Sequence, residues 1–249
     1  MEHESEIREL HEKRQQCKTC KKIDDEVEQC WYPIFEYKTM EVLRVLSDRC
    51  EKQKYHYRLK RIEELFGTSG IGKRFQNRRF ETFKITDKNK PAYEKCKKYC
   101  ENFPYEDGHG LLIIGDYGTG KTHLAVSILH SILEKDVSSL FVLVPELLMK
   151  IRSSFDDKTD SNQLIRKIKK VSFLVFDDLG AEKTTDWVRE QLFMIINSRY
   201  EDMLPTVITS NLPLKELEDK IGPRTVSRLI EMCEGVMLGG EDYRKQKLR

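Results

Sequence analysis

The sequence predicts an α/β fold: a five-stranded parallel sheet flanked by helices, with a small amino-terminal appendage. Beyond about residue 110, short apolar runs alternate with longer segments of helical periodicity. A glycine-rich loop joins the first of these runs to a helical segment. Parallel strands need crossover connections, which helices on both faces of a sheet supply. Cysteines gathered near the amino terminus set the appendage apart from this main fold.

Five apolar runs are predicted as buried strands, and the segments between them as helices. A further helix begins near Pro91, because proline is favoured in the first turn, and it precedes the first strand. The predicted strands cover residues 111–114, 140–144, 171–176, 206–210 and 236–238, and the predicted helices 121–134, 145–155, 161–170, 185–202 and 223–233. With 249 residues, the chain is long enough for one sizeable core plus a small appendage.

Three regions are predicted along the chain. Residues 1–66 form a cysteine-rich, helical amino-terminal domain, because apolar residues recur at helical spacing between Thr39 and Phe66. Three glycines at 67, 70 and 72 interrupt that pattern and mark the joint. Residues 67–90 are a basic linker, and residues 91–249 are the main domain. The stretch 51–100 holds 15 Lys and Arg against six Asp and Glu.

Composition excludes several classes of protein. The 44 Lys and Arg nearly balance the 42 Asp and Glu, so no global field marks a general polyanion binder. No apolar run reaches the roughly 18–20 residues that span a bilayer, and the amino terminus is acidic where a signal peptide is basic. These features predict a soluble, cytoplasmic protein without a membrane partner. In that compartment the seven cysteines are expected to stay reduced.

The strongest motif is a complete G-x-x-x-x-G-K-T loop between a predicted strand and a predicted helix. Its backbone N–H groups surround phosphate oxygens, the helix N-terminus faces them, and lysine neutralises their charge. The Thr122 hydroxyl is a ligand for Mg²⁺. The alternative is a chance glycine turn. The predicted nucleotide-binding residues are Gly115, Asp116, Tyr117, Gly118, Thr119, Gly120, Lys121, Thr122 and His123.

Polar residues follow two other predicted strands. Asp177 and Asp178 end the run Phe-Leu-Val-Phe, at the edge where ligands bind in open α/β sheets. Asp177 is predicted to hold Mg²⁺, and Asp178 to orient or deprotonate an attacking water. Asn211 follows the next strand and is positioned to bond the γ-phosphate or the water. The alternatives are a solvated Asp-Asp turn and an ordinary Asn-Leu-Pro turn.

The order of these landmarks resembles a known family. Gly-Thr-Gly-Lys-Thr-His-Leu-Ala, Phe-Asp-Asp-Leu-Gly-Ala-Glu, Thr-Ser-Asn and Arg-Thr-Val-Ser-Arg-Leu occur in the order and spacing of the bacterial replicative-helicase loaders of the DnaC/DnaI type. These loaders and the related IstB transposition ATPase belong to the AAA+ class. The similarity covers residues 75–244. It implies a P-loop ATPase in which Lys121 and Thr122 bind ATP and Mg²⁺, Asp177 and Asp178 are the Walker B acids, and Asn211 is sensor 1.

The resemblance also assigns three arginines. Arg228, or Arg224 as the alternative, takes the place of the arginine finger, and Arg244 that of a second sensor. An arginine remote from its own glycine loop acts only on a neighbouring subunit's nucleotide, so the assignment entails self-association. A solvated basic helix face is the alternative, since Arg224 and Arg228 are four residues apart. No separate carboxyl-terminal helical lid is expected.

The amino-terminal cysteines are a candidate structural zinc site. Cys17, Cys20, Cys30 and Cys50 supply four thiolates within thirty-four residues, and zinc stabilises segments too small for a core. The resemblance strengthens this hypothesis, because loaders of the DnaI type have zinc-bearing amino-terminal domains. His11 and His56 are alternative fourth ligands. Unliganded thiols are the other alternative.

Cations interleaved with aromatics between residues 52 and 98 are a candidate contact for single-stranded DNA. Bases stack on aromatic rings while cations neutralise phosphates. The aromatic residues are Tyr55, Tyr57, Phe75, Phe80 and Phe83. A solvated face with core aromatics is the alternative.

The resemblance implies an ATP-dependent loader that delivers a replicative DNA helicase to single-stranded DNA, with weak ATP hydrolysis stimulated by its partner or by DNA. The alternative function is an IstB-like helper ATPase that directs a transposase to target DNA. A small-molecule P-loop kinase and a non-enzymatic ATP-binding module are two further hypotheses. The kinase hypothesis needs a lid and an acceptor pocket, and the sequence offers no candidate segment for either.

Overall fold

The computed structural model describes residues 12, 32–38, 41–48, 70–73, 75–153 and 158–246. The chain divides into two compact units, residues 1–64 and residues 65–249. The cysteines and histidines of the zinc hypothesis, Cys17, Cys20, Cys30, Cys50, His11 and His56, lie outside the described residues, as do Tyr55 and Tyr57.

The described part of the first unit is an antiparallel hairpin. Strand β1, Tyr32–Lys38, pairs with strand β2, Glu41–Asp48, and the register changes between Glu36 and Tyr37. The predicted helix from Thr39 to Phe66 is therefore wrong over residues 41–48. Leu43 and Leu46 fit helical spacing, but Val42 and Val45 are β-branched, and residues 32–38 supply the partner strand that a helix would leave without hydrogen bonds.

The second unit contains the predicted five-stranded parallel sheet, which is confirmed. The strand order is β4-β5-β6-β3-β7, and every pairing is parallel. The strands are β3, Gly110–Ile114; β4, Ser139–Leu143; β5, Phe173–Asp177; β6, Thr206–Ser210; and β7, Cys233–Met237. β6 lies between β3 and β5, so the carboxyl ends of these three strands are neighbours at one edge of the sheet.

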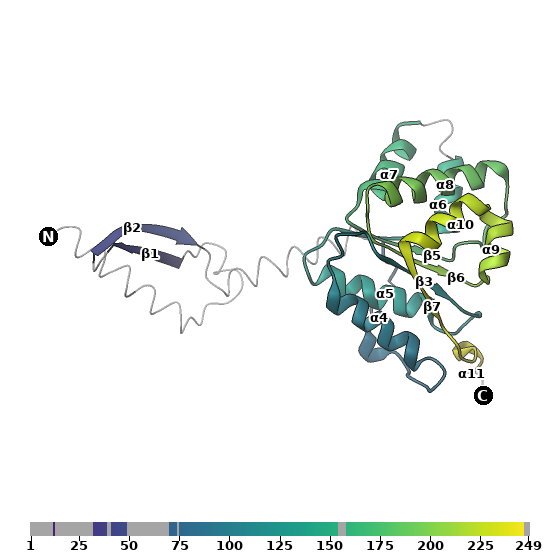
Figure 1. The fold of residues 1–249 in the computed structure, drawn as a ribbon, viewed down its shortest axis with the longest axis horizontal. Coiled ribbons are helices and arrows are strands. Elements are labelled where there is room, and N and C mark those ends of the chain that lie inside the picture. The colour runs from purple at the N-terminus through teal and green to yellow at the C-terminus, as the bar shows by residue number, and fades with distance from the viewer. Residues whose placement is uncertain are drawn as a thin grey trace. The chain divides into compact units, whose positions relative to one another are not determined.

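Helices cover both faces of this sheet (Figure 1). They are α4, Lys90–Asn102; α5, Lys121–Leu133; α6, Val144–Ser153; α7, Lys158–Lys170; α8, Asp186–Glu201; α9, Leu214–Ile221; and α10, Pro223–Met232. The short helix α11, Tyr243–Gln246, follows β7. The strong helical signal of residues 223–233 ends one residue early, at Met232, where β7 begins. Helix α9 was not predicted. None of the described helices is long and apolar enough to cross a membrane.

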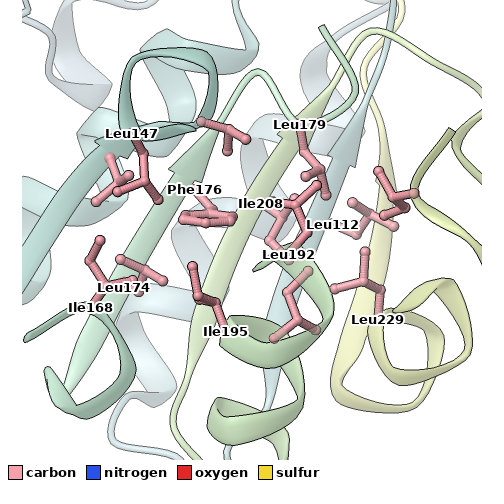
Figure 2. Close-up of a cluster of buried hydrophobic side chains, with 14 of the residues drawn as sticks. Leu112, Leu147, Ile168, Leu174, Phe176, Leu179, Leu192, Ile195, Ile208 and Leu229 are labelled. Carbon is pink, nitrogen blue, oxygen red and sulfur yellow. The ribbon is translucent and has the colours of Figure 1, made fainter. Parts of the chain in front are cut away.

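Two hydrophobic clusters result from the alternation of side chains along the strands. Leu111, Ile113 and Val207 point to the face covered by α4 and α5. Leu112, Phe176 and Ile208 point to the opposite face, where they meet Leu192 and Ile195 of α8 and Leu229 of α10 (Figure 2). Because both faces are buried, β3, β5 and β6 consist of residues with little solvent exposure throughout.

The segment predicted as a basic linker contributes to the first of these clusters. Phe80 begins the short 3₁₀ helix η1, Phe80–Thr82, and both Phe80 and Phe83 are buried. Their rings contact Tyr93 of α4, with centroid distances of 5.5 and 5.7 Å. These two aromatics are core residues, so they are not available to stack nucleic-acid bases, and that part of the DNA hypothesis is wrong.

A buried guanidinium connects the amino end of β6 to its surroundings. The Arg199 side chain of α8 is 1% exposed. Its Nε donates to Thr206 Oγ1 (2.8 Å), and its two terminal nitrogens donate to the carbonyls of Ile168, Val171 and Pro205 at 2.8–2.9 Å. These bonds satisfy two carbonyls at the end of α7 and just after it, and a third in the connection that leads into β6.

Replacing Arg199 with Ala should lower the free energy of unfolding by at least about 3 kcal/mol, because several buried acceptors lose their donor at about 1–3 kcal/mol each. The matched control is Arg189→Ala on the same helix. Arg189 also donates to two carbonyls, those of Asp219 and Lys220, but at the surface, so its loss should cost about 1 kcal/mol or less. Urea unfolding followed by Trp187 fluorescence, in a Trp31→Phe background, measures both. Equal losses would contradict the prediction.

Candidate nucleotide-binding site

The glycine-rich loop between β3 and α5 is folded as a compact turn. Gly118 and Gly120 have φ angles of 76° and 104°, in the left-handed region that side chains rarely adopt. A Cβ on Gly120 would lie 2.8 Å from the Phe83 ring. Lys121 Nζ and Thr119 Oγ1 both donate to the Asp116 carbonyl, each at 2.8 Å. The loop thus brings the buried Lys121 side chain and the N-terminus of α5 to the same side of the turn.

Asp177 lies directly behind the loop, at the end of β5. Its carboxylate is 2% exposed and accepts bonds from two hydroxyls. Thr122 Oγ1 donates at 3.0–3.1 Å, and Thr209 Oγ1 donates at 2.6 Å. Burial raises the pKa of Asp177 to about 6, against the lowering effect of the Thr209 hydrogen bond, and the neighbouring Asp178 raises it further. The two hydroxyls hold the carboxylate in place, while its burial costs desolvation free energy.

Asp178 and Asn211 meet across the ends of β5 and β6. Asn211 Nδ2 donates to Asp178 Oδ1 at 3.2 Å. The Asp178 backbone N–H donates to Thr209 Oγ1 at 3.0 Å, and its φ of 59° turns the chain away from the strand. The acidic side chain is therefore directed to a different environment from that of Asp177, although the two residues are adjacent.

A cleft of about 710 Å³ opens over these groups. Of the residues predicted from sequence, Tyr117, Gly118, Thr119, Gly120, Lys121, Thr122, His123, Asp178 and Asn211 line it. Gly115, Asp116 and Asp177 do not: they lie behind the lining, Gly115 against Leu238 and Asp177 against Thr122. Tyr117 is 68% exposed at the loop.

The opposite wall of the cleft comes from the segment predicted as a linker. Phe75, Arg78, Thr82, Phe83, Lys84, Thr86 and Asn89 line it. Asn89 holds the turn, since its Oδ1 accepts from the Thr86 N–H (2.7 Å) and its Nδ2 donates to the Lys84 carbonyl (3.0 Å). His123 Nε2 donates to the Arg79 carbonyl at 2.9 Å, which connects this wall to α5. The aromatics and cations that the sequence presents as a DNA contact thus include residues that line this cleft.

The carboxyl-terminal segment returns to the same cleft. Gly240, Glu241 and Tyr243 line it, and the Tyr243 N–H donates to the Gly118 carbonyl at 3.1 Å. Lys84 Nζ lies 5.8 Å from the centroid of the Tyr243 ring. Arg244, the predicted second sensor, is in α11, immediately after this contact, but its side chain lies outside the described part of the structure.

The candidate arginine fingers, Arg224 and Arg228, both belong to α10 and do not line the described cleft. The Arg228 guanidinium lies 4.5 Å from the centroid of the Tyr200 ring, and its Nε donates to Asn197 Oδ1 at 3.3 Å. Arg224 is exposed. The structure therefore brings neither arginine to the phosphate loop of its own chain.

The donor set fits magnesium and a nucleoside triphosphate. A hydroxyl from Thr122 and a carboxylate from Asp177 are adjacent, and hard oxygen ligands of this kind suit Mg²⁺. When bound, Mg²⁺ neutralises charge on phosphate oxygens. The glycine loop, Lys121 and the start of α5 supply the phosphate-binding half of the cleft, and the opposite wall leaves room for a nucleoside.

The fold and the site together define a P-loop ATPase of the AAA+ class. Residues 65–249 match the family model described as IstB-like ATP binding protein. The chain belongs to this family. Its sheet and helices also align with the crystal structure of the DnaC helicase loader, with a TM-score of 0.63 and 30% identity over 68% of this chain and 100% of that chain.

Two curated relatives have names that state a function. The replicative helicase loader DnaI of Bacillus subtilis is 31% identical over 150 residues, which are 55% of this chain and 48% of that protein. The replicative helicase loader DnaC of Escherichia coli K12 is 27% identical over 176 residues, 69% of this chain and 71% of that protein. The chain thus spans about half the length of DnaI.

Replacing Asp177 with Asn should stabilise the ligand-free protein, and the gain should depend on pH. The folded-state pKa of Asp177 is about 6, above its unfolded value, so ionisation of this carboxyl lowers the stability of the folded protein as pH rises through that range. In EDTA at pH 8, the variant should therefore be more stable by roughly 3 kcal/mol, and by about half of that at pH 5. Urea unfolding at both pH values measures this. Asp87→Asn, at an exposed site, is the control, and a gain independent of pH would contradict the prediction.

Proposed function

We propose that this protein is an ATP-dependent loader that delivers a replicative DNA helicase to single-stranded DNA. The observation that supports this most is the joint arrangement of loop, acids and Asn211 at one edge of the sheet, in a chain whose named relatives are helicase loaders. The function as an IstB-like transposition helper is less favoured, because the curated relatives named above are loaders.

We assign a role to each polar group of the site. Lys121 and the loop bind the phosphates, and Thr122 and Asp177 hold Mg²⁺. Asp178 orients or deprotonates the attacking water, and Asn211, bonded to Asp178, responds to the γ-phosphate. Aspartate has a shorter reach than glutamate in this position, so hydrolysis is expected to be slow until partner or DNA binding adjusts the site.

Self-association completes the site. Arg228 is 38% exposed at its side chain and is held against Tyr200, so its guanidinium is positioned before any partner arrives. Because it is absent from the cleft of its own chain, it serves the nucleotide of an adjacent copy. Arg224, one turn away on α10, is the alternative finger.

The amino-terminal unit is proposed to contact the helicase and to hold structural zinc through Cys17, Cys20, Cys50 and either Cys30 or a histidine. Single-stranded DNA is a further proposed partner. Since Phe80 and Phe83 are buried, the cations of residues 73–79 would contact DNA through phosphates.

Replacing Lys121 with Ala should abolish helicase loading, because the phosphates lose their buried cation. The assay mixes the protein, the host's replicative helicase and circular single-stranded DNA, and measures the helicase that elutes with DNA. The wild-type protein with ATP should raise that amount at least tenfold over helicase alone. Lys215→Ala, an exposed lysine on α9, is the control and should load normally. If the wild-type protein gives no increase and instead retains a transposase on DNA, the transposition function replaces loading.

Arg228→Ala should lower ATP hydrolysis by about 10³-fold, the usual contribution of an arginine finger, while ATP binding persists. Mixing this variant with Lys121→Ala should restore part of the activity, since one supplies an intact loop and the other an intact finger. Turnover in the mixture, compared with each variant alone, measures this. The same mixture made with Arg224→Ala tests the alternative finger. If neither mixture recovers activity although both chains associate, the finger does not act between subunits.

A further inference from the structure

Thr209 has a position in the site that the motifs do not account for. It lies at the carboxyl end of β6, opposite Ile113 of β3, and its side chain is fully buried. A hydroxyl in such surroundings costs free energy unless it is hydrogen-bonded. The partners of this hydroxyl are the carboxylate of Asp177 and the backbone N–H of Asp178.

The hydroxyl makes two bonds of opposite sense. Its single proton goes to Asp177 Oδ1, at 2.6 Å, because a carboxylate only accepts. Its oxygen accepts from the Asp178 backbone N–H, at 3.0 Å. One side chain therefore fixes the carboxylate of Asp177 and the main chain of Asp178.

The surrounding backbone is hydrogen-bonded across the same two segments, residues 177–179 and the end of β6. The Leu179 N–H donates to the Thr209 carbonyl at 2.9 Å, and Ser210 Oγ donates to the Leu179 carbonyl at 2.7 Å. These bonds hold residues 177–179 against β6 beyond the point where the regular pairing of β5 and β6 ends, at Phe176 and Ile208. The Asp178 turn, with its positive φ, occurs inside this bonded stretch.

Thr209 differs from the other hydroxyl on Asp177. Thr122 Oγ1 is itself a candidate Mg²⁺ ligand, so it serves both the metal site and the acid. Thr209 does not line the cleft. It holds Asp177 from the side away from the cleft, in the way that outer groups orient the ligands of a metal site.

We propose that Thr209 is a positioning residue. Its hydroxyl aligns Asp177 for Mg²⁺ and Asp178 for the attacking water, without contacting the metal or the water itself. The inference rests on the nucleotide chemistry of the proposed function and is independent of helicase loading.

The test compares three single substitutions on β6. Thr209→Val keeps the shape and removes the hydroxyl, and Thr209→Ser keeps the hydroxyl. Thr206→Val is the matched control, because Thr206 is a second buried threonine of the same strand. Its hydroxyl bonds Arg199 and the Leu204 carbonyl, away from the site.

Two measurements are made on each full-length protein. The first is ATP turnover at saturating ATP as a function of Mg²⁺ concentration. The second is the affinity for a fluorescent ATP analogue in EDTA and in Mg²⁺. For Thr209→Val, turnover should fall 10–100-fold, and the gain in affinity that Mg²⁺ gives the wild type should be reduced by a similar factor. Affinity in EDTA should stay within about twofold, and Thr209→Ser should restore both properties.

Three results would overturn the inference: unchanged Mg²⁺ dependence and turnover in Thr209→Val, failure of Thr209→Ser to restore them, or an equal defect in Thr206→Val, which would indicate a general loss of stability. A protein that retains the Thr209 effect but does not load helicase would refute the proposed loading and leave this inference standing. A wild type that binds the analogue without any Mg²⁺ effect would refute the inference together with the assigned nucleotide chemistry.

Discussion

The structure depends on one constraint: polar groups buried at the two ends of the central strand β6 must be paired inside the protein. At the amino end, the Thr206 hydroxyl meets the guanidinium of Arg199, which also satisfies three carbonyls. At the carboxyl end, the Thr209 hydroxyl meets Asp177 and the main chain of Asp178. The first set of bonds fastens α7 and α8 to the sheet, and the second arranges the acids, so stability and chemistry are served by opposite ends of one strand.

Placing an acid in this position has a thermodynamic cost. Asp177 is nearly inaccessible to water, and its pKa is raised although two hydroxyls donate to it. A neutral side chain would fit the apolar surroundings better, which is a common compromise at functional sites. The carboxylate is useful because a divalent cation interacts strongly with a charge that water does not screen.

Much of the main fold was predictable from local patterns. The apolar runs and the glycine loop predicted the five parallel strands, because strands buried on both faces are uniformly apolar and the loop requires a strand before it and a helix after it. Helix α9 was missed because its eight residues include only three apolar ones, Leu214, Leu217 and Ile221. The hairpin of the first unit was missed because Leu43 and Leu46 fit a helical period, while the pairing that makes 41–48 a strand is a contact between segments.

The far wall of the cleft was the least predictable part of the site. Alternating cations and aromatics do not reveal whether rings face solvent or the core, and here Phe83 faces both His123 and Tyr93. Only the fold of residues 75–89 against α5 shows that the segment is part of the cleft. The role of Thr209 was also hidden, since threonine is an ordinary strand residue and its partners lie thirty-one and thirty-two residues away.

That wall also links ligand binding to the stability of residues 75–89. Residues 75–89 follow closely after the boundary at residue 64, and they are connected to α5 through the His123 hydrogen bond to Arg79. A molecule that fills the cleft contacts these residues as well as the glycine loop, so its binding free energy also stabilises the packing of residues 75–89 against α5. Ligand binding and the local stability of this wall are therefore coupled without any rearrangement of the sheet.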